Sequence, residues 1–188
     1  KFTITENEMG STNTDPPRAC YIEGKRCGEA ICHIFNENKN IKIARLSLGY
    51  GPGTKKDDKR VLNSLIEKGL FNDKIELLDA GQSIRTYCYI SDVIEMMWNI
   101  FLHGKETVYN VGGKSQLSIL ELANMIGKYF RQDVVLPDVS KEISGSPKIV
   151  NISIDRYLKE FNKTDFVSMK EGLNNTIEWQ KFIYDYDN

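Results

Sequence analysis

The residues best placed to do chemistry are Tyr21 and Lys25, which are separated by Ile22, Glu23 and Gly24. On a helix, side chains at positions i and i+4 lie on one face and can act together. An ammonium group beside a phenol favours the phenolate form. A phenol tuned in this way can remove a hydroxyl proton while hydride leaves the same carbon. The same spacing also occurs by chance in helices, as a surface tyrosine beside a solvated lysine, so the pair alone leaves both interpretations open.

A helix and a strand are predicted around this pair. The first 18 residues read as a loop, in which Pro16 and Pro17 disfavour a helix. Apolar residues then recur at helical spacing from about Ala19 to Asn38. A β-prone run over 41–50 follows at once and ends in a glycine and proline turn. A long helix followed directly by a buried strand is half of a βαβ unit, so the sequence predicts an α/β fold.

The rest of the chain alternates in the same way. Ser91 is the expected N-cap of a helix that has Asp92 in its first turn and closes at Gly104. Ser118 and Glu121 predict a capping box at the start of another helix. The remaining expected helices are 61–71, 154–161 and 168–184, and the remaining expected strands are 74–78, 85–90 and 107–113.

Composition is typical of a soluble globular domain, with 40% hydrophobic residues and a net charge of -1. That charge gives no field that would draw the chain to nucleic acid or to an anionic membrane. The sequence has no apolar run of about 20 residues, the length of a membrane span, and no signal-peptide h-region at its start. The four cysteines show no CxxC spacing and the two histidines lie far apart, so we expect neither a zinc site nor a disulfide framework, but buried or neutral thiols in a reducing cytoplasm.

The residues around Tyr21 make the pair specific. The segment PPRACYIEGKRCGEAIC resembles the one around the active-site tyrosine of extended short-chain dehydrogenase/reductases that act on nucleotide sugars. Within that family it looks most like the UDP-glucuronate decarboxylases, also called UDP-xylose synthases. The family's other landmarks follow in order: Ala44-Arg45-Leu46-Ser47-Leu48-Gly49-Tyr50-Gly51-Pro52, Gly81 to Arg85, Tyr89-Ile90-Ser91-Asp92-Val93, Tyr109-Asn110-Val111-Gly112, and Ser118 to Ala123.

The resemblance implies a role for each matching residue. Tyr21 would be the general base and acid of the redox step, and Lys25 would tune it and hold the nicotinamide ribose of NAD. Arg85 matches the arginine that approaches the sugar diphosphate; a strand-end arginine paired with a local carboxylate is the alternative. Arg60 and Val61 match the start of the segment that cradles the nucleotide, whereas the neighbouring charges read equally well as a solvated run. The implied substrate is a nucleotide sugar, most simply a UDP-sugar, and the implied assembly is a cytoplasmic homodimer formed through the helix with Tyr21 and the helix after Ser91.

Three positions depart from the decarboxylase pattern. Leu48 stands where the family has an asparagine near the substrate phosphates, and Gly53 stands where it has an arginine. Leu78 replaces an aromatic residue that often stacks on the nucleobase. These departures concern the decarboxylase subgroup and leave the wider family unaffected.

The resemblance also predicts the domain organisation. Residues 1–52 and 86–112 would be the C-terminal part of an NAD-binding Rossmann domain, and residues 53–85 and 113–188 the smaller substrate domain. No GxGxxG or Walker sequence is present, so the glycine-rich cofactor half is expected to be missing from this chain, which alone should be inactive.

The reaction expected of the whole protein runs through a 4-keto sugar and ends in epimerisation, dehydration or decarboxylation. Two other functions stay open. One is a non-catalytic NAD-binding relative of the same fold. The other is an unrelated helix-rich interaction domain, which would require Tyr21 and Lys25 to face solvent with no cleft nearby.

Overall fold

Helices and strands alternate along the chain, which confirms the predicted α/β class. The computed structural model describes residues 3–10, 19–36, 40–138 and 148–186. The helices are α1 (Ala19–Asn36), α2 (Val61–Phe71), α3 (Ile90–His103), α4 (Ile119–Phe130), α5 (Asp155–Phe161) and α6 (Met169–Tyr186). The strands are β1 (Ile43–Leu46), β2 (Leu48–Tyr50), β3 (Ile75–Glu76), β4 (Ile84–Tyr89), β5 (Val108–Val111), β6 (Ser115–Ser118), β7 (Val134–Val135) and β8 (Ile149–Val150).

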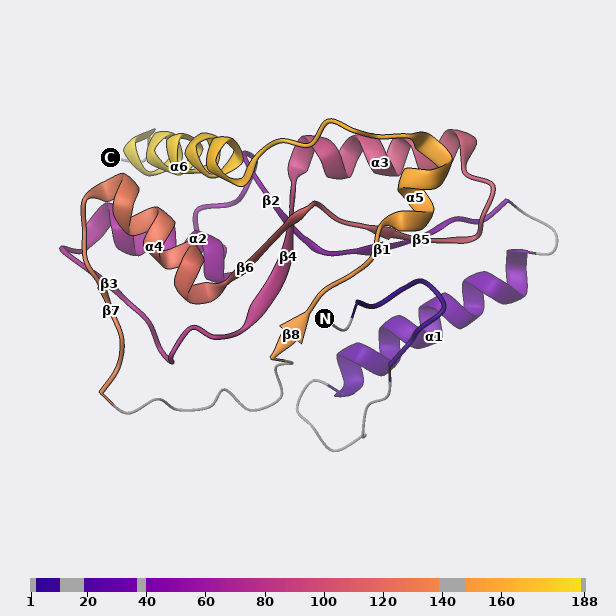
Figure 1. Ribbon diagram of the computed structural model, residues 1–188, viewed down its shortest axis with the longest axis horizontal. Helices are drawn as coiled ribbons and strands as arrows, with labels where there is room; N and C mark the ends of the chain where they lie inside the picture. Colours follow the sequence, from indigo (N-terminus) through magenta and orange to yellow (C-terminus); the bar gives the residue numbers. More distant parts are fainter. Residues whose placement is uncertain (1–2, 11–18, 37–39, 139–147, 187–188) are drawn as a thin grey trace.

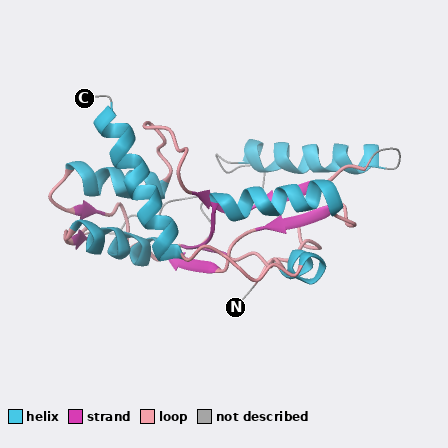
Figure 2. Ribbon diagram, turned by 90° about the horizontal axis from the view of Figure 1, so that it is seen from above, coloured by secondary structure: helices cyan, strands magenta, loops and turns pink. Residues whose placement is uncertain are grey.

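Strands β1 and β5 form a parallel pair with Ile43 opposite Val108 and Leu46 opposite Val111. Helix α1 lies on one side of this pair and α3 lies on the other (Figures 1 and 2). The result is a layer of parallel strands between helices, the arrangement expected of βαβ units. It positions α1, the helix that contains Tyr21.

The β-prone run over 41–50 is two strands rather than the single strand predicted. The Ser47 N–H still donates to Val111 O, at 2.8 Å, but the chain then leaves β5. Strand β2 pairs instead with β4 in parallel, with Leu48 opposite Tyr87. Strand β4 pairs further with β6, antiparallel, and with β8, parallel. The chain therefore leaves the sheet of β1 and β5 at Ser47 and enters the sheet of β2 and β4.

Helix ends follow the sequence where a local cap decides them. The capping box is confirmed: Ser118 Oγ accepts from Glu121 N at 3.1 Å, and Glu121 Oε2 accepts from Ser118 N at 2.7 Å. Gly104 is confirmed as a C-cap, since its N–H donates to Ile100 O. The prediction of Ser91 as an N-cap is wrong, because β4 runs straight into α3 and Tyr89 is the N-cap.

Several bounds also differ from the prediction. The strand expected over 74–78 is reduced to β3, which pairs with β7 through only two residue pairs. Strands β6, β7 and β8 had no clear sequence signal, because each is short and is held by a partner far along the chain. In the N-terminal segment, Ile4 forms an isolated parallel bridge with Ile152, whereas Pro16, Pro17 and Asn38 lie outside the described residues.

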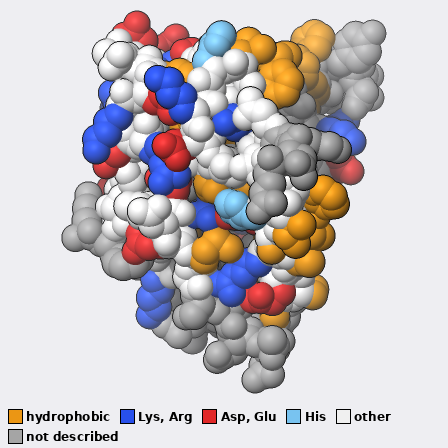
Figure 3. Space-filling view, turned by 90° about the vertical axis from the view of Figure 1, so that its right-hand side faces the viewer, with side chains coloured by type: hydrophobic (Ala, Val, Ile, Leu, Met, Phe, Trp, Pro, Cys, Tyr) orange, Lys and Arg blue, Asp and Glu red, His pale blue; other side chains and the backbone are white. Residues whose placement is uncertain are grey.

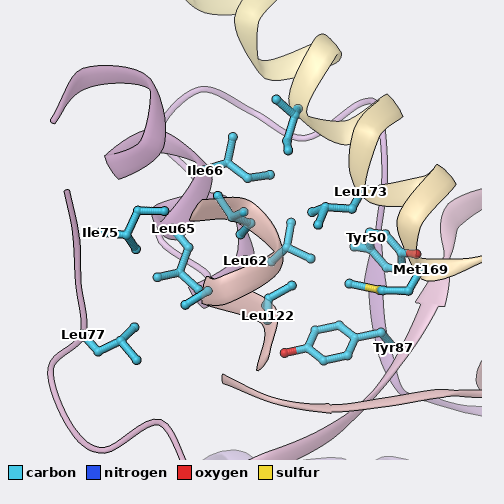
Figure 4. Packing of buried hydrophobic residues seen from close by; sticks show 13 residues of the cluster. Tyr50, Leu62, Leu65, Ile66, Ile75, Leu77, Tyr87, Leu122, Met169 and Leu173 are labelled. Carbon is cyan, nitrogen blue, oxygen red and sulfur yellow. The ribbon is translucent and has the colours of Figure 1, made fainter. Parts of the chain in front are cut away.

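Two hydrophobic clusters hold these layers together. The first lies between α2, α4 and α6 and includes Leu62, Ile66, Leu122 and Leu173 (Figure 4). The second packs α3 and α5 onto β5. Its fully buried members include Met96, Tyr109 and Tyr157. Burying each such side chain contributes about 1.5–3 kcal/mol, so the clusters fix the elements on which the site residues stand.

The cysteines are all free: Cys20 and Cys27 are exposed, Cys32 is half-buried and Cys88 is buried. Of the two thiols on α1 expected to be buried or neutral, Cys27 is therefore not buried and Cys32 is only partly so. Within the described ranges, no cluster of three His, Cys, Asp or Glu side chains is arranged to hold a metal. No helix among those residues is long and apolar enough to cross a membrane.

Candidate active site

The predicted pair is intact in α1. Lys25 Nζ lies 5.7 Å from the centroid of the Tyr21 ring. The Tyr21 side chain is 59% exposed. Among the described residues, neither the Tyr21 hydroxyl nor the Lys25 ammonium has a hydrogen-bond or ion-pair partner. Both groups are thus available to a bound molecule.

The surface around α1 is unusually apolar. Within the described part of the chain, β1 pairs only with β5, so its other edge has no strand partner. Figure 3 views the molecule from the end at which α1 and α3 finish, and apolar side chains gather at the top and along one side of that face. Besides Tyr21, the large exposed apolar residues of these two helices are Ile31, Ile34, Phe35, Ile94, Met97, Trp98, Phe101 and Leu102. An open strand edge flanked by apolar patches is typical of a surface that another piece of structure covers.

Arg60 and Val61 lie at the start of α2. Arg60 makes a forked contact with Asp58, with Nε to Oδ1 at 3.0 Å and Nη2 to Oδ2 at 2.6 Å. These bonds favour the carboxylate and lower the pKa of Asp58 to about 2. Arg60 itself remains 64% exposed at its side chain, and Val61 is 48% exposed. Both residues therefore present atoms to solvent at the N-terminal end of α2.

Arg85 lies on β4 and is half-buried. Its Nη1 donates to the carbonyl oxygen of Ile84 at 2.8 Å and to that of Lys148 at 3.5 Å. These bonds tie the guanidinium to the sheet where β4 meets β8. These bonds fix the orientation of the guanidinium, whose planar set of N–H donors suits a phosphate.

The structure keeps the predicted residues on three separate elements, α1, the start of α2 and β4. None of Tyr21, Lys25, Arg60, Val61 and Arg85 lines the two cavities described next. One cavity, of about 410 Å³, lies between α1, β1, α5 and the N-terminal segment. The other, of about 180 Å³, lies beside the start of α3. Only the Tyr21 and Lys25 pair is brought together by contact.

The sequence interpretation missed two charged pairs that support these elements. Arg45, on β1, binds Glu29, on α1. Lys163 binds Asp92, and the two side chains are each only 6% exposed. A signal existed for the first pair, because a charged residue within a β-prone apolar run needs a partner when it is buried.

All three departures from the decarboxylase pattern are exposed. Leu48 is 42% exposed and Leu78 is 77% exposed, so both present apolar surface where a polar or aromatic group was expected. Gly53 has φ +96°, a conformation that other residues rarely adopt. An arginine at position 53 would be strained on this backbone.

Comparison with known proteins identifies the family of this chain. The sequence model of the NAD dependent epimerase/dehydratase family matches residues 2–112, more than half of the chain. The chain therefore belongs to the NAD dependent epimerase/dehydratase family.

Its relatives include UDP-glucuronic acid decarboxylase 6 of Arabidopsis thaliana, 29% identical over 171 residues that cover 90% of this chain and 50% of that protein. UDP-glucuronic acid decarboxylase 1 of Xenopus tropicalis is 26% identical over 177 residues, which cover 93% of this chain and 42% of that protein. The chain thus spans about half the length of the curated relatives it matches.

Solved structures show the same fold. The UDP-glucuronic acid 4-epimerase of Bacillus cereus, in complex with UDP-glucuronic acid and NAD, is similar with a TM-score of 0.76 and 27% identity, over 93% of this chain and 57% of that one. The UDP-glucose 4-epimerase of Thermotoga maritima has a TM-score of 0.81 at 18% identity, over 98% of this chain and 59% of that one. Membership of this α/β family excludes the unrelated helix-rich interaction domain, although Tyr21 and Lys25 do face solvent.

Proposed function

We propose that this chain carries the proton-transfer dyad of an NAD-dependent enzyme that modifies a nucleotide sugar through a 4-keto intermediate. The observation that carries the proposal is the Tyr21 and Lys25 pair on α1. The two side chains lie next to each other, and neither polar group has a hydrogen-bond or ion-pair partner among the described residues. It supports the proposal because the helix stands beside parallel strands in a chain of the epimerase/dehydratase family.

In this mechanism the Tyr21 phenolate takes the proton of the sugar 4-hydroxyl as that carbon is oxidised to the ketone. The Lys25 ammonium stabilises the phenolate before this transfer and binds a ribose hydroxyl of the cofactor. NAD, when bound, would supply the hydride acceptor for the oxidation and the hydride donor for the later reduction. The ketone acidifies the neighbouring C5 position, or stabilises the loss of a C5 carboxyl group as CO₂. Tyr21 returns the proton when the 4-hydroxyl is restored.

Arg85, Arg60 and Val61 are proposed to bind the nucleotide sugar. Arg85 is a fixed guanidinium on β4 and suits a diphosphate. Arg60 and Val61 expose one cationic and one apolar group at the start of α2, where a nucleotide could lie. A substrate that contacts all three residues must span from the start of α2 to β4, because Arg60 and Val61 do not contact Arg85.

The cofactor half is proposed to cover the open edge of β1 and the apolar sides of α1 and α3. Residues 1–52 and 86–112 would then complete an NAD-binding domain, and residues 53–85 and 113–188 would form the substrate domain. Without that half, the chain lacks a glycine-rich phosphate-binding turn and is expected to be inactive. A homodimer through α1 and α3, and a place in the cytoplasm, belong to the same proposal.

Decarboxylation of UDP-glucuronate is the outcome that the sequence relatives favour, since the two proteins named above are UDP-glucuronic acid decarboxylases. The second candidate is a non-catalytic NAD-binding relative. Gly53 favours it, because the arginine of the decarboxylase pattern would be strained on this backbone.

The experiment that separates them uses the natural polypeptide that carries this sequence. It is incubated with NAD and a panel of UDP-, GDP-, CDP- and dTDP-sugars, and the products are identified by mass spectrometry. A sugar that is epimerised, dehydrated or decarboxylated supports the enzyme. Tight NAD binding with no turnover of any sugar supports the non-catalytic relative and contradicts our proposal.

A further inference from the structure

The charged loop, residues 54–60 between β2 and α2, has the sequence TKKDDKR. Its four cationic and two acidic side chains give it a net charge of +2, which suits a diphosphate. None of its residues is buried, so the loop has no apolar side chain that could anchor it in a hydrophobic core. Its anchors lie elsewhere, on α6, which is far along the chain.

The face of α6 that meets α2 changes character along the helix. Leu173 and Ile177 are buried in the first hydrophobic cluster, where Leu173 lies near Leu62 of α2 (Figure 4). Gln180 and Tyr184 continue the same stripe, at positions i+7 and i+11 from Leu173, and they are also buried. Their side chains end in polar groups, and a buried polar group is costly unless it is hydrogen-bonded. This face therefore packs on α2 in its first half and presents hydrogen-bonding groups in its second.

Two side chains of α6 bind the main chain of the charged loop. Trp179 Nε1 donates to Thr54 O at 3.1 Å, and Tyr184 Oη donates to Lys56 O at 2.8 Å. The Tyr184 ring packs against Phe71, at the end of α2, with the ring centroids 4.9 Å apart. Because both acceptors are backbone carbonyl groups, these bonds fix the course of the main chain rather than the positions of the charged side chains.

A third side chain of α6 reaches the end of the charged loop through α2. Gln180 Nε2 donates to Asn63 Oδ1 at 3.1 Å, and both side chains are buried. Gln180 Oε1 has no partner among the described residues, so the bond to Asn63 is what holds this amide. Asn63 in turn hydrogen-bonds the Asp58 carboxylate, which binds Nε and Nη2 of Arg60. A chain of contacts thus runs from Gln180 to Arg60.

Asp58 orients Arg60 and leaves part of its guanidinium available. The carboxylate accepts from Arg60 Nε and Nη2, and Asp58 Oδ1 also accepts from Arg60 N at 2.9 Å. Arg60 Nη1 has no hydrogen-bond partner among the described residues. Since the guanidinium is planar and rigid, fixing one edge of it also fixes where the Nη1 donors point.

We infer that α6 is the positioning element of the substrate-binding segment, with Trp179, Gln180 and Tyr184 as its positioning residues. They fix the charged loop, so that Arg60 and Val61 are already in place when a nucleotide sugar binds. A loop that must be ordered at the moment of binding lowers affinity, and prior order avoids that loss. The inference rests on the proposed role of Arg60 and Val61, but the contacts of α6 with the loop do not depend on any reaction.

The first measurement is hydrogen–deuterium exchange of the charged loop in the natural polypeptide, followed by mass spectrometry. Two amides report on the order of the loop: Asp58 N donates to Lys55 O at 3.2 Å, and Arg60 N donates to Asp58 Oδ1 at 2.9 Å. Tyr184→Phe removes the hydroxyl and keeps the ring. We expect the loop amides to exchange about 10-fold faster in this variant, because the loop opens more easily. Trp179→Phe, which removes the other donor, should act in the same direction.

The matched control is Tyr157→Phe. Tyr157 of α5 is fully buried, and its Oη accepts from Asn99 Nδ2 at 2.8 Å. This variant also takes a hydrogen bond from a buried tyrosine, but in the second hydrophobic cluster, so loop exchange should stay at the wild-type rate. Glu67 of α2 lies beside the Tyr184 hydroxyl and 3.7 Å from Lys59 Nζ. Because an exposed ion pair contributes little, Glu67→Gln should leave loop exchange unchanged too.

The second measurement is calorimetry with UDP, GDP, CDP and dTDP. For the diphosphate that wild type binds most tightly, Tyr184→Phe should raise the Kd about 5- to 10-fold. The KM for the corresponding sugar should rise by a similar factor with kcat unchanged, whereas a loss of folded protein would lower kcat and leave the KM alone. If Tyr184→Phe does not fold, Trp179→Phe takes its place in both measurements.

Three results would overturn the inference: unchanged loop exchange in Tyr184→Phe, equal loosening of the loop in either control, or faster exchange with an unchanged Kd. If wild type binds none of the four diphosphates, the proposed role of Arg60 and Val61 fails. Loop exchange then decides by itself whether α6 holds the loop, so the two failures are distinguishable.

Discussion

Lys25 Nζ lies 5.7 Å from the centroid of the Tyr21 ring, one helical turn along α1, and both side chains are open to solvent. If this pair performs the proton transfer, Tyr21→Phe should lower kcat on the order of a thousand-fold, because it removes the group that moves the proton. Lys25→Met should lower kcat less and also weaken NAD binding. Steady-state kinetics with NAD titrations would measure both effects.

The matched control is Tyr129→Phe. Tyr129 Oη contacts Glu178 and accepts from Lys181 Nζ, far from α1 along the chain. Its loss should leave kcat unchanged. An equal loss of rate in Tyr129→Phe, or an active Tyr21→Phe, would remove Tyr21 from the mechanism.

Arg85 should matter for substrate binding more than for the chemical step. Replacing it by Met should raise the Kd for the nucleotide sugar about 10- to 100-fold, because charge-assisted bonds to a phosphate are worth about 1.5–3 kcal/mol. Arg85→Lys should recover only part of the affinity. Calorimetry with the nucleoside diphosphate alone would measure this, with the exposed Lys170→Met as control. Unchanged diphosphate affinity in Arg85→Met would place the substrate elsewhere.

Two buried tyrosines should respond in opposite ways to loss of the hydroxyl. Tyr87 Oη is buried and has no hydrogen-bond partner among the described residues. Tyr109 Oη accepts from Glu106 N at 2.8 Å and donates to Glu160 Oε2 at 2.7 Å. Removing an unpaired hydroxyl is neutral or stabilising, whereas breaking a buried hydrogen bond costs about 1–3 kcal/mol. Denaturant unfolding should therefore show Tyr87→Phe to be no less stable than wild type and Tyr109→Phe to be destabilised. If Tyr87→Phe were destabilised and Tyr109→Phe were not, the hydrogen bonding assigned to these two hydroxyl groups would be wrong.

Stability should fall at high pH. Burial raises the pKa of Tyr87 to about 12, and burial with the Glu160 hydrogen bond raises the pKa of Tyr109 to about 12. The folded state therefore holds these protons more tightly than the unfolded chain, in which tyrosine titrates near 10. The resulting stabilisation is fully present below pH 10 and is lost as pH rises through about 12. Urea midpoints at pH 8, 10 and 11, alongside phenolate absorbance, would measure it. A midpoint that stays constant over this range would contradict the assigned burial.

The sequence located the elements that local signals define. The apolar period over 61–71 and the capping box at Ser118 gave helices whose bounds the structure reproduces. It failed at Ser91, because the N-cap was decided by β4 running directly into the helix. It also missed the division at Ser47, where the choice between β5 and β4 as partner is a matter of tertiary structure.

The site was predictable only in part for the same reason. Tyr21 and Lys25 lie four positions apart on one helix, so their contact follows from helical geometry. Arg45 and Glu29 are 16 positions apart, and only the packing of α1 beside β1 brings them together. The proposed contacts of Arg60 and Arg85 with substrate could not follow from local geometry, because they require a ligand that joins separate elements.

The central claim is that Tyr21 removes the 4-hydroxyl proton of a nucleotide sugar while NAD takes the hydride from C4, and trapping the resulting ketone tests it most directly. The natural polypeptide is mixed with NAD and UDP-glucuronate, or with whichever sugar of the panel is turned over, and is quenched during one turnover into borodeuteride. We predict deuterium at C4 of the recovered sugar in wild type and none in Tyr21→Phe. Turnover with no deuterium at C4 in wild type, or equal labelling in Tyr21→Phe, would contradict the account.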